Sequence, residues 1–111
     1  MTHQPAKPAY DITVVDESLE IHLHRDFDAN GRDSNWVSVL GQRFPGPYSR
    51  VVLDLTQLGQ RVNSSFFSGL YLLHQLYSAP DQPPVILRGG THERVRQGLE
   101  ILSLSQFFTI E

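Results

Sequence analysis

The chain has 111 residues, enough for one globular domain and too few for a second large one. Hydrophobic residues make up 40% of it and charged residues 19%, a composition that argues against intrinsic disorder. The formal charge of -3 supplies no basic surface, so nucleic acid is not expected as the main partner. Because the chain contains no cysteine, disulfides, thiolate metal sites and cysteine nucleophiles are excluded, and a reducing, cytoplasmic environment is expected.

The N-terminal stretch differs in composition from the rest of the chain. Residues 1–9 are polar, contain two prolines and have no apolar segment of the kind found in signal peptides. No window approaches the roughly 18 consecutive apolar residues of a membrane-spanning helix, so membrane insertion is not expected. We predict a flexible tail over 1–9 and a single domain over 10–111.

Two strands joined by a tight turn are predicted at the start of the domain. Residues 11–15 are rich in β-branched side chains, and residues 19–24 alternate between apolar and polar. Residues 16–18 between them favour a hairpin turn. A polar loop over 26–31 follows, in which Asn30 and Gly31 tolerate a positive φ.

A first helix is predicted to begin after Asp33 or Ser34, either of which can serve as its N-cap. It should end near Arg43, because Pro45 and Pro47 cannot continue a helix. Apolar side chains recur within it at helical spacing: Trp36, Val37, Leu40 and Phe44.

The middle of the chain predicts a buried strand and a long helix. Residues 50–55 are almost continuously apolar, which is typical of a central strand with parallel neighbours. Residues 63–65 offer three N-cap candidates for the helix. One helical stripe contains Phe66, Leu70, Leu73 and Tyr77, with Phe67 and Leu76 beside it. The aromatic residues Phe66, Phe67 and Tyr71 fit either the core or an exposed ridge that binds a partner.

The C-terminal third predicts a strand over 85–87, a helix and a final strand over 107–110. Thr91 can cap this helix, whose apolar positions are Val95, Leu99 and Leu102. The complete order is β-β-α-β-α-β-α-β. This order indicates an α/β fold in which a mixed sheet is flanked by helices, because the first two strands form a hairpin and the later ones follow helical crossovers.

The central strand sequence VVLDL and the following NSSFFSGLYLLHQL resemble the core of a STAS domain, the fold of bacterial anti-sigma factor antagonists. Residues 85–90, the next helix and the closing strand are similar to the C-terminal part of that family. Asp54 matches the acidic residue that often ends the central strand there. The resemblance covers residues 10–111.

In those antagonists an Asp-Ser/Thr-Ser-Gly tetrad begins the second helix, and a kinase that is also an anti-sigma factor phosphorylates its first hydroxyl. Asn63 stands at the Asp position, Ser64 at the phosphorylated hydroxyl, Ser65 at the next Ser and Phe66 at the Gly. The resemblance therefore implies phosphorylation at Ser64 and partner binding by Asn63, Ser64, Ser65, Phe66 and Phe67. The departures at Asn63 and Phe66 keep open the alternative that Ser64 only caps the helix.

Other candidate sites carry weaker signals. His22 and His24 share one strand face, but no third ligand accompanies them, so no metal is expected. Ser68 and His74 lie too far apart along their helix to form a nucleophile pair. Residues 89–91 fit a glycine-rich phosphate cradle or a plain turn with a cap.

We therefore expect a non-catalytic regulatory module without a cofactor, which binds a serine-kinase anti-sigma factor and is switched by phosphorylation at Ser64. The alternative is a constitutive STAS adaptor that binds a transport ATPase or a signalling assembly and is never phosphorylated. An enzyme or small-ligand carrier ranks last, because no set of polar residues converges on a pocket. The sequence leaves the oligomeric state open.

Overall fold

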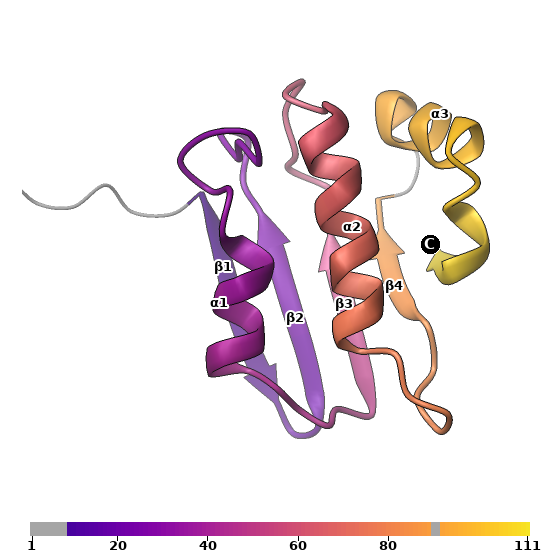
Figure 1. Ribbon diagram of the computed structural model, residues 1–111. Helices are drawn as coiled ribbons and strands as arrows, with labels where there is room; N and C mark the ends of the chain where they lie inside the picture. Colours follow the sequence, from indigo (N-terminus) through magenta and orange to yellow (C-terminus); the bar gives the residue numbers. More distant parts are fainter. Residues whose placement is uncertain (1–8, 90–91) are drawn as a thin grey trace, which may run out of the picture.

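The computed structural model describes residues 9–89 and 92–111 as one α/β domain (Figure 1). Its elements in chain order are β1 (Tyr10–Val15), β2 (Ser18–Leu23), α1 (Trp36–Arg43), β3 (Arg50–Asp54), α2 (Ser64–Leu76), β4 (Val85–Arg88), α3 (Glu93–Ile101), a 3₁₀ turn (Ser105–Phe107) and β5 (Phe108–Ile110). The predicted order of strands and helices is confirmed. No helix within the described ranges is both long enough and apolar enough to cross a membrane.

The five strands form one mixed sheet in the order β1-β2-β3-β4-β5. The hairpin strands β1 and β2 are antiparallel, and the pairs β2–β3, β3–β4 and β4–β5 are parallel. The predicted central strand is therefore central. Its apolar run is explained by Val51 and Leu53, which are buried on one face, and Val52, which is fully buried on the other.

Helices α1 and α2 lie side by side across one face of the sheet (Figure 1). The predicted stripe of α2 is confirmed, because Phe66, Leu70, Leu73 and Tyr77 are all buried. The two helices approach closely at Gly69, where an added Cβ would lie 2.7 Å from Trp36 Nε1. Glycine at this position therefore allows the indole to pack against the backbone of α2.

The opposite face of the sheet carries polar side chains. In β2 the residues Leu19, Ile21 and Leu23 are buried toward the helices, so the alternating Glu20 and His22 point the other way. Side chains of this face pair across the strands, as Arg88 of β4 does with Glu20 of β2 at 3.3 Å.

Several predicted boundaries need correction. Ala9, assigned to the tail, is 5% exposed, donates its N–H to Asp33 Oδ1 and accepts from His24 N, so the ordered domain includes it. Residues 1–8 of the predicted tail lie outside the described residues. The N-cap of α1 is Asn35 rather than Asp33 or Ser34. Asp33 cannot cap because its carboxylate is used elsewhere, on the backbone N–H groups of Ala9 and Asp28.

Two corrections concern α3. Its N-cap is His92, and the predicted cap Thr91 lies outside the described residues. The helix ends at Ile101, so Leu102 does not share the buried stripe of Val95 and Leu99 and is 52% exposed. This exposure matters for the surface beside α2.

Candidate functional site

The N-terminus of α2 is fixed by Asn63. This residue has an extended backbone, and its Oδ1 accepts a hydrogen bond from Phe66 N at 3.1 Å. An N-cap of this kind satisfies one of the backbone N–H groups that the first turn leaves unpaired. Among the three candidates at 63–65, Asn63 is the cap, so the simple interpretation of Ser64 as the cap is wrong.

The two serines that follow have different environments. Ser65 is half-buried, and its Oγ donates to Asn30 Oδ1 at 3.0 Å, which ties α2 to the loop before α1. Ser64 is exposed, and within residues 9–89 and 92–111 its Oγ has no hydrogen-bond partner. Ser64 is therefore the more accessible hydroxyl of the pair.

Phe66 and Phe67 are both buried, but they pack against different parts of the fold. Phe66 is 0% exposed and packs edge-to-face on Phe27 and Phe67. The expectation that its side chain contacts a partner is therefore wrong, because a bulky ring at this position points into the core. Phe67 is 9% exposed and packs on α3 at Gly98, where an added Cβ would lie 1.9 Å from its ring.

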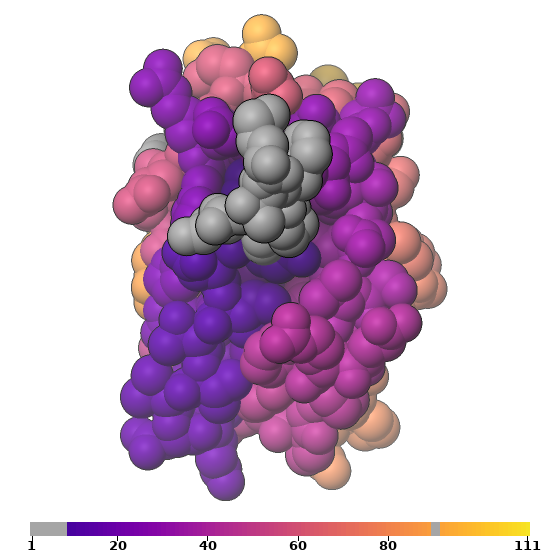
Figure 2. Space-filling model, turned by 90° about the vertical axis from the view of Figure 1, so that its left-hand side faces the viewer, coloured from indigo at the N-terminus to yellow at the C-terminus, as the bar shows by residue number. Residues whose placement is uncertain are grey.

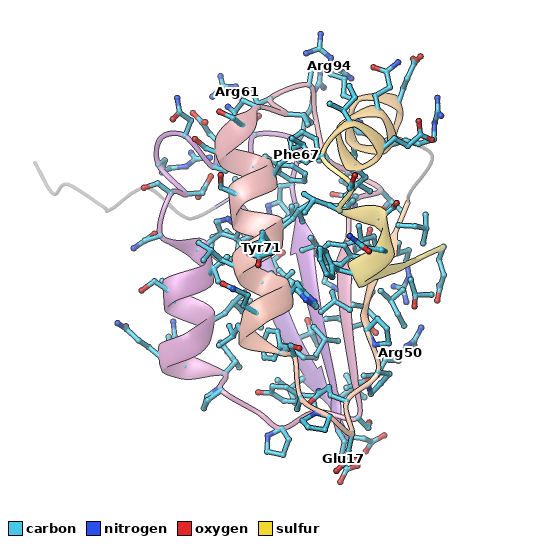
Figure 3. All side chains as sticks on the ribbon, turned by 45° about the vertical axis from the view of Figure 1, so that its right-hand side comes forward. Glu17, Arg50, Arg61, Phe67, Tyr71 and Arg94 are labelled. Carbon is cyan, nitrogen blue, oxygen red and sulfur yellow. The ribbon has the colours of Figure 1, made fainter. Side chains whose placement is uncertain are left out.

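An open apolar groove runs beside Ser64, between α2 and the segment after α3. Its lining consists of Ser64, Phe67, Ser68, Tyr71, Leu72, Leu102 and Leu104. Three of these apolar side chains are well exposed: Tyr71 at 40%, and Leu72 and Leu102 at 52% each. Figure 3 shows Phe67 and Tyr71 on successive turns of α2, with Phe67 on the side of α3. We call this surface the α2 groove.

Positive charge lies near the start of α2. Arg61 precedes the helix, and its Nη1 lies 3.3 Å from Asp28 Oδ2. Arg94 at the start of α3 is at the same end of the molecule (Figure 3). The first turn of α2 has no acidic residue. Since Arg61 is already paired with a carboxylate, it is the helix dipole and the absence of an acidic residue in the first turn that favour an anion at the α2 N-terminus.

Asp54 belongs to a polar cluster on the opposite face of the sheet. Its Oδ1 accepts from Thr56 N at 2.9 Å and Thr56 Oγ1 at 2.6 Å, and its Oδ2 lies 3.2 Å from His22 Nδ1. Arg88 Nη1 lies 3.7 Å from the same carboxylate and 3.3 Å from Glu20 Oε1. Burial alone would raise the pKa of Asp54, but the hydrogen bonds from Thr56 and His22 outweigh it and lower the pKa.

The remaining candidates do not converge on a chemical site. His22 lies between Asp54 and Glu20, whereas His24 Nε2 pairs with Asp11 at 2.7 Å. The described part of the chain contains no group of three or more side chains suited to hold a metal ion. His74 stacks on Phe107 with ring centroids 4.4 Å apart. Gly89 has φ +84° at the end of β4, and Gly90 and Thr91 of the predicted turn lie outside the described residues.

Comparison with known proteins supports the fold and adds no function. Neither the protein-family models nor the curated protein sequences give a significant match. Among solved structures, the NMR structure of the protein TM1081 is similar, with a TM-score of 0.74 and 13% sequence identity. The match covers 100% of this chain and 86% of that one, so it shows that the complete α/β architecture recurs in another protein.

Proposed function

We propose that this protein is a STAS-like regulatory module that binds a protein partner through the α2 groove and is switched by phosphorylation at Ser64. The observation that carries the proposal is the position of an exposed Ser64 hydroxyl at a helix N-terminus, on the rim of an apolar groove and without a hydrogen-bond partner in the described part of the chain. The partner is proposed to be a bacterial anti-sigma factor of the serine-kinase type. No catalytic role is proposed for the domain.

The surroundings of Ser64 support a switch that leaves the fold intact. A phosphoryl group would add about -1.5 to -2 charges and three acceptor oxygens. The free N–H groups of the first helical turn and the helix dipole favour that charge in the unbound protein. In a complex, the same dianion would be desolvated against apolar Leu72 and Leu102, which would weaken binding by several kcal/mol.

A constitutive adaptor is the second candidate, and Asn63 and Phe66 favour it. Both depart from the antagonist tetrad. In the structure Asn63 caps α2 and Phe66 is buried in the core. In this alternative the α2 groove binds a transport ATPase or a signalling assembly without regulation at Ser64.

Intact-mass analysis with fragmentation tests the switch, on protein recovered from its native host. We expect a fraction carrying one phosphoryl group on Ser64, which disappears in Ser64→Ala and persists in Ser65→Ala. Unmodified protein under several growth conditions would refute the switch and favour the adaptor.

The groove is tested separately by substituting exposed apolar residues. Leu72→Ser removes an apolar side chain from the groove, and Ile110→Ser removes one of similar exposure, 45% against 52%, from β5. We expect Leu72→Ser to reduce recovery of the bound partner at least tenfold and Ile110→Ser to leave it unchanged. Equal recovery by both variants would show that the partner binds elsewhere.

A further inference from the structure

Among the strands of residues 9–89 and 92–111, β2 is the one neighbour of β1, so β1 forms an edge of the described sheet. Figure 2 views the molecule from this side, where β1 (indigo) forms part of the surface beside α1 (magenta). Edge strands in natural proteins are commonly protected by lysine, proline or a bulge. The sequence of β1, YDITVV, has none of these, and its one charged residue, Asp11, is paired with His24.

The pattern of hydrogen bonds between β1 and β2 shows which backbone groups of β1 face away from the sheet. His24 N donates to Ala9 O at 2.8 Å, so Ala9 and His24 form a hydrogen-bonded pair in the register of the hairpin. Hydrogen-bonded and non-hydrogen-bonded pairs alternate along an antiparallel ladder. Consequently Tyr10, Ile12 and Val14 direct their N–H and C=O groups away from β2.

Of the antiparallel registers that two copies of β1 can form, one pairs all three of these outward residues of each copy. If Ile12 of one copy lies opposite Ile12 of a second copy, Tyr10 of each faces Val14 of the other. Three hydrogen-bonded pairs then give about six interchain hydrogen bonds. Asp11 lies opposite Thr13 in this register, so no like charges meet. The side chain of Val14, 45% exposed in the monomer, is covered.

We propose that β1 pairs with β1 of a second copy of this chain, forming a two-fold symmetric dimer with a continuous ten-stranded sheet. The twofold axis passes through the Ile12 pair, perpendicular to the sheet, so the α1–α2 layers of both copies lie on the same side. The dimer leaves both α2 grooves open, because each groove is lined by α2 and the segment after α3, and α3 lies on the far side of α2 from β1 (Figure 1).

Sedimentation equilibrium over a wide concentration range tests the dimer, with two matched proline variants. Val14→Pro removes an outward N–H of β1 without touching the β1–β2 bonds. Ile110→Pro is the control. Glu111, the residue after β5, makes backbone hydrogen bonds to Leu87 and Gly89, so the N–H of the preceding Ile110 points away from β4. The side chains of Ile110 and Val14 are both 45% exposed. We expect wild type and Ile110→Pro to dimerise and Val14→Pro to dissociate at least tenfold more readily, with circular dichroism confirming its fold.

A cysteine cross-link decides the register, even if Val14→Pro fails to fold. The wild-type chain has no cysteine, so a single introduced thiol can react only with its counterpart. With a short bifunctional maleimide, Ile12→Cys is expected to form covalent dimers much faster than Val14→Cys, whose two copies lie several residues apart. A monomeric wild type, polymers larger than a dimer, a folded Val14→Pro that still dimerises, or equal cross-linking of both cysteines would overturn the proposal.

Discussion

Replacing the N-cap of α2 tests how the candidate site is held. Asn63→Ala removes the acceptor of the 3.1 Å hydrogen bond from Phe66 N. Because the same helix contributes Phe66, Leu70 and Leu73 to the core, it cannot fray at its start without exposing buried side chains. We expect the free energy of unfolding to fall by about 1 kcal/mol, the usual cost of losing such a cap. With an m-value of about 1–3 kcal/mol/M, the urea midpoint should fall by about 0.3–1 M.

Asn35→Ala is the matched control, since the α1 N-cap Asn35 makes no side-chain capping bond. This variant should change the midpoint by much less. Asn63→Asp keeps the acceptor and adds a negative charge at the helix N-terminus, so its stability should equal or exceed that of the wild type. Equal losses in Asn63→Ala and Asn35→Ala would refute the assignment of the cap.

Three further predictions concern packing and pH. Gly69→Ala should destabilise the protein by about 1–3 kcal/mol in urea unfolding because its Cβ would meet the indole of α1, whereas Gly41→Ala, with an ordinary 3.5 Å contact, should be neutral or stabilising. The pKa of Asp54 is lower in the folded protein than its ordinary 3.8, so the ionised carboxylate stabilises the fold above that pH and the contribution is lost as the pH falls. The difference in free energy of unfolding between wild type and Asp54→Asn should therefore shrink below pH 3.8. A difference that stays constant with pH would contradict the lowered pKa. Tyr77→Phe should cost about 1 kcal/mol in thermal unfolding, because a 2.8 Å bond from its hydroxyl to the C-cap carbonyl of α1 is lost.

The order of elements could be predicted because local signals agree with the tertiary structure. The α2 stripe at Phe66, Leu70 and Leu73 has helical spacing, and the run at 51–53 is apolar because the central strand is buried on both faces. The cap of α1 could not be predicted from Asp33, since local spacing does not reveal that its carboxylate binds Ala9, 24 residues earlier in the chain.

The α2 groove could not be predicted from the sequence pattern either. Leu102 fits the helical spacing of Val95 and Leu99, and only the end of α3 at Ile101 places it on the surface. Its neighbours in the groove, Tyr71 and Leu72, come from α2, some 30 residues earlier in the chain, so the surface is defined by tertiary packing. Asn63, by contrast, can be predicted as a cap candidate, because its residue type and its position before an apolar stripe are local features.

The single tryptophan makes the α1–α2 contact visible to spectroscopy. Trp36 is 1% exposed, packs edge-to-face on Phe27 and lies against Gly69, in the same helix as Ser64. Its fluorescence therefore arises from one place, and any tilt or sliding of α2 on α1 alters the polarity and quenching around that indole. The protein thus carries its own optical reporter for movements of the helix that begins at Ser64.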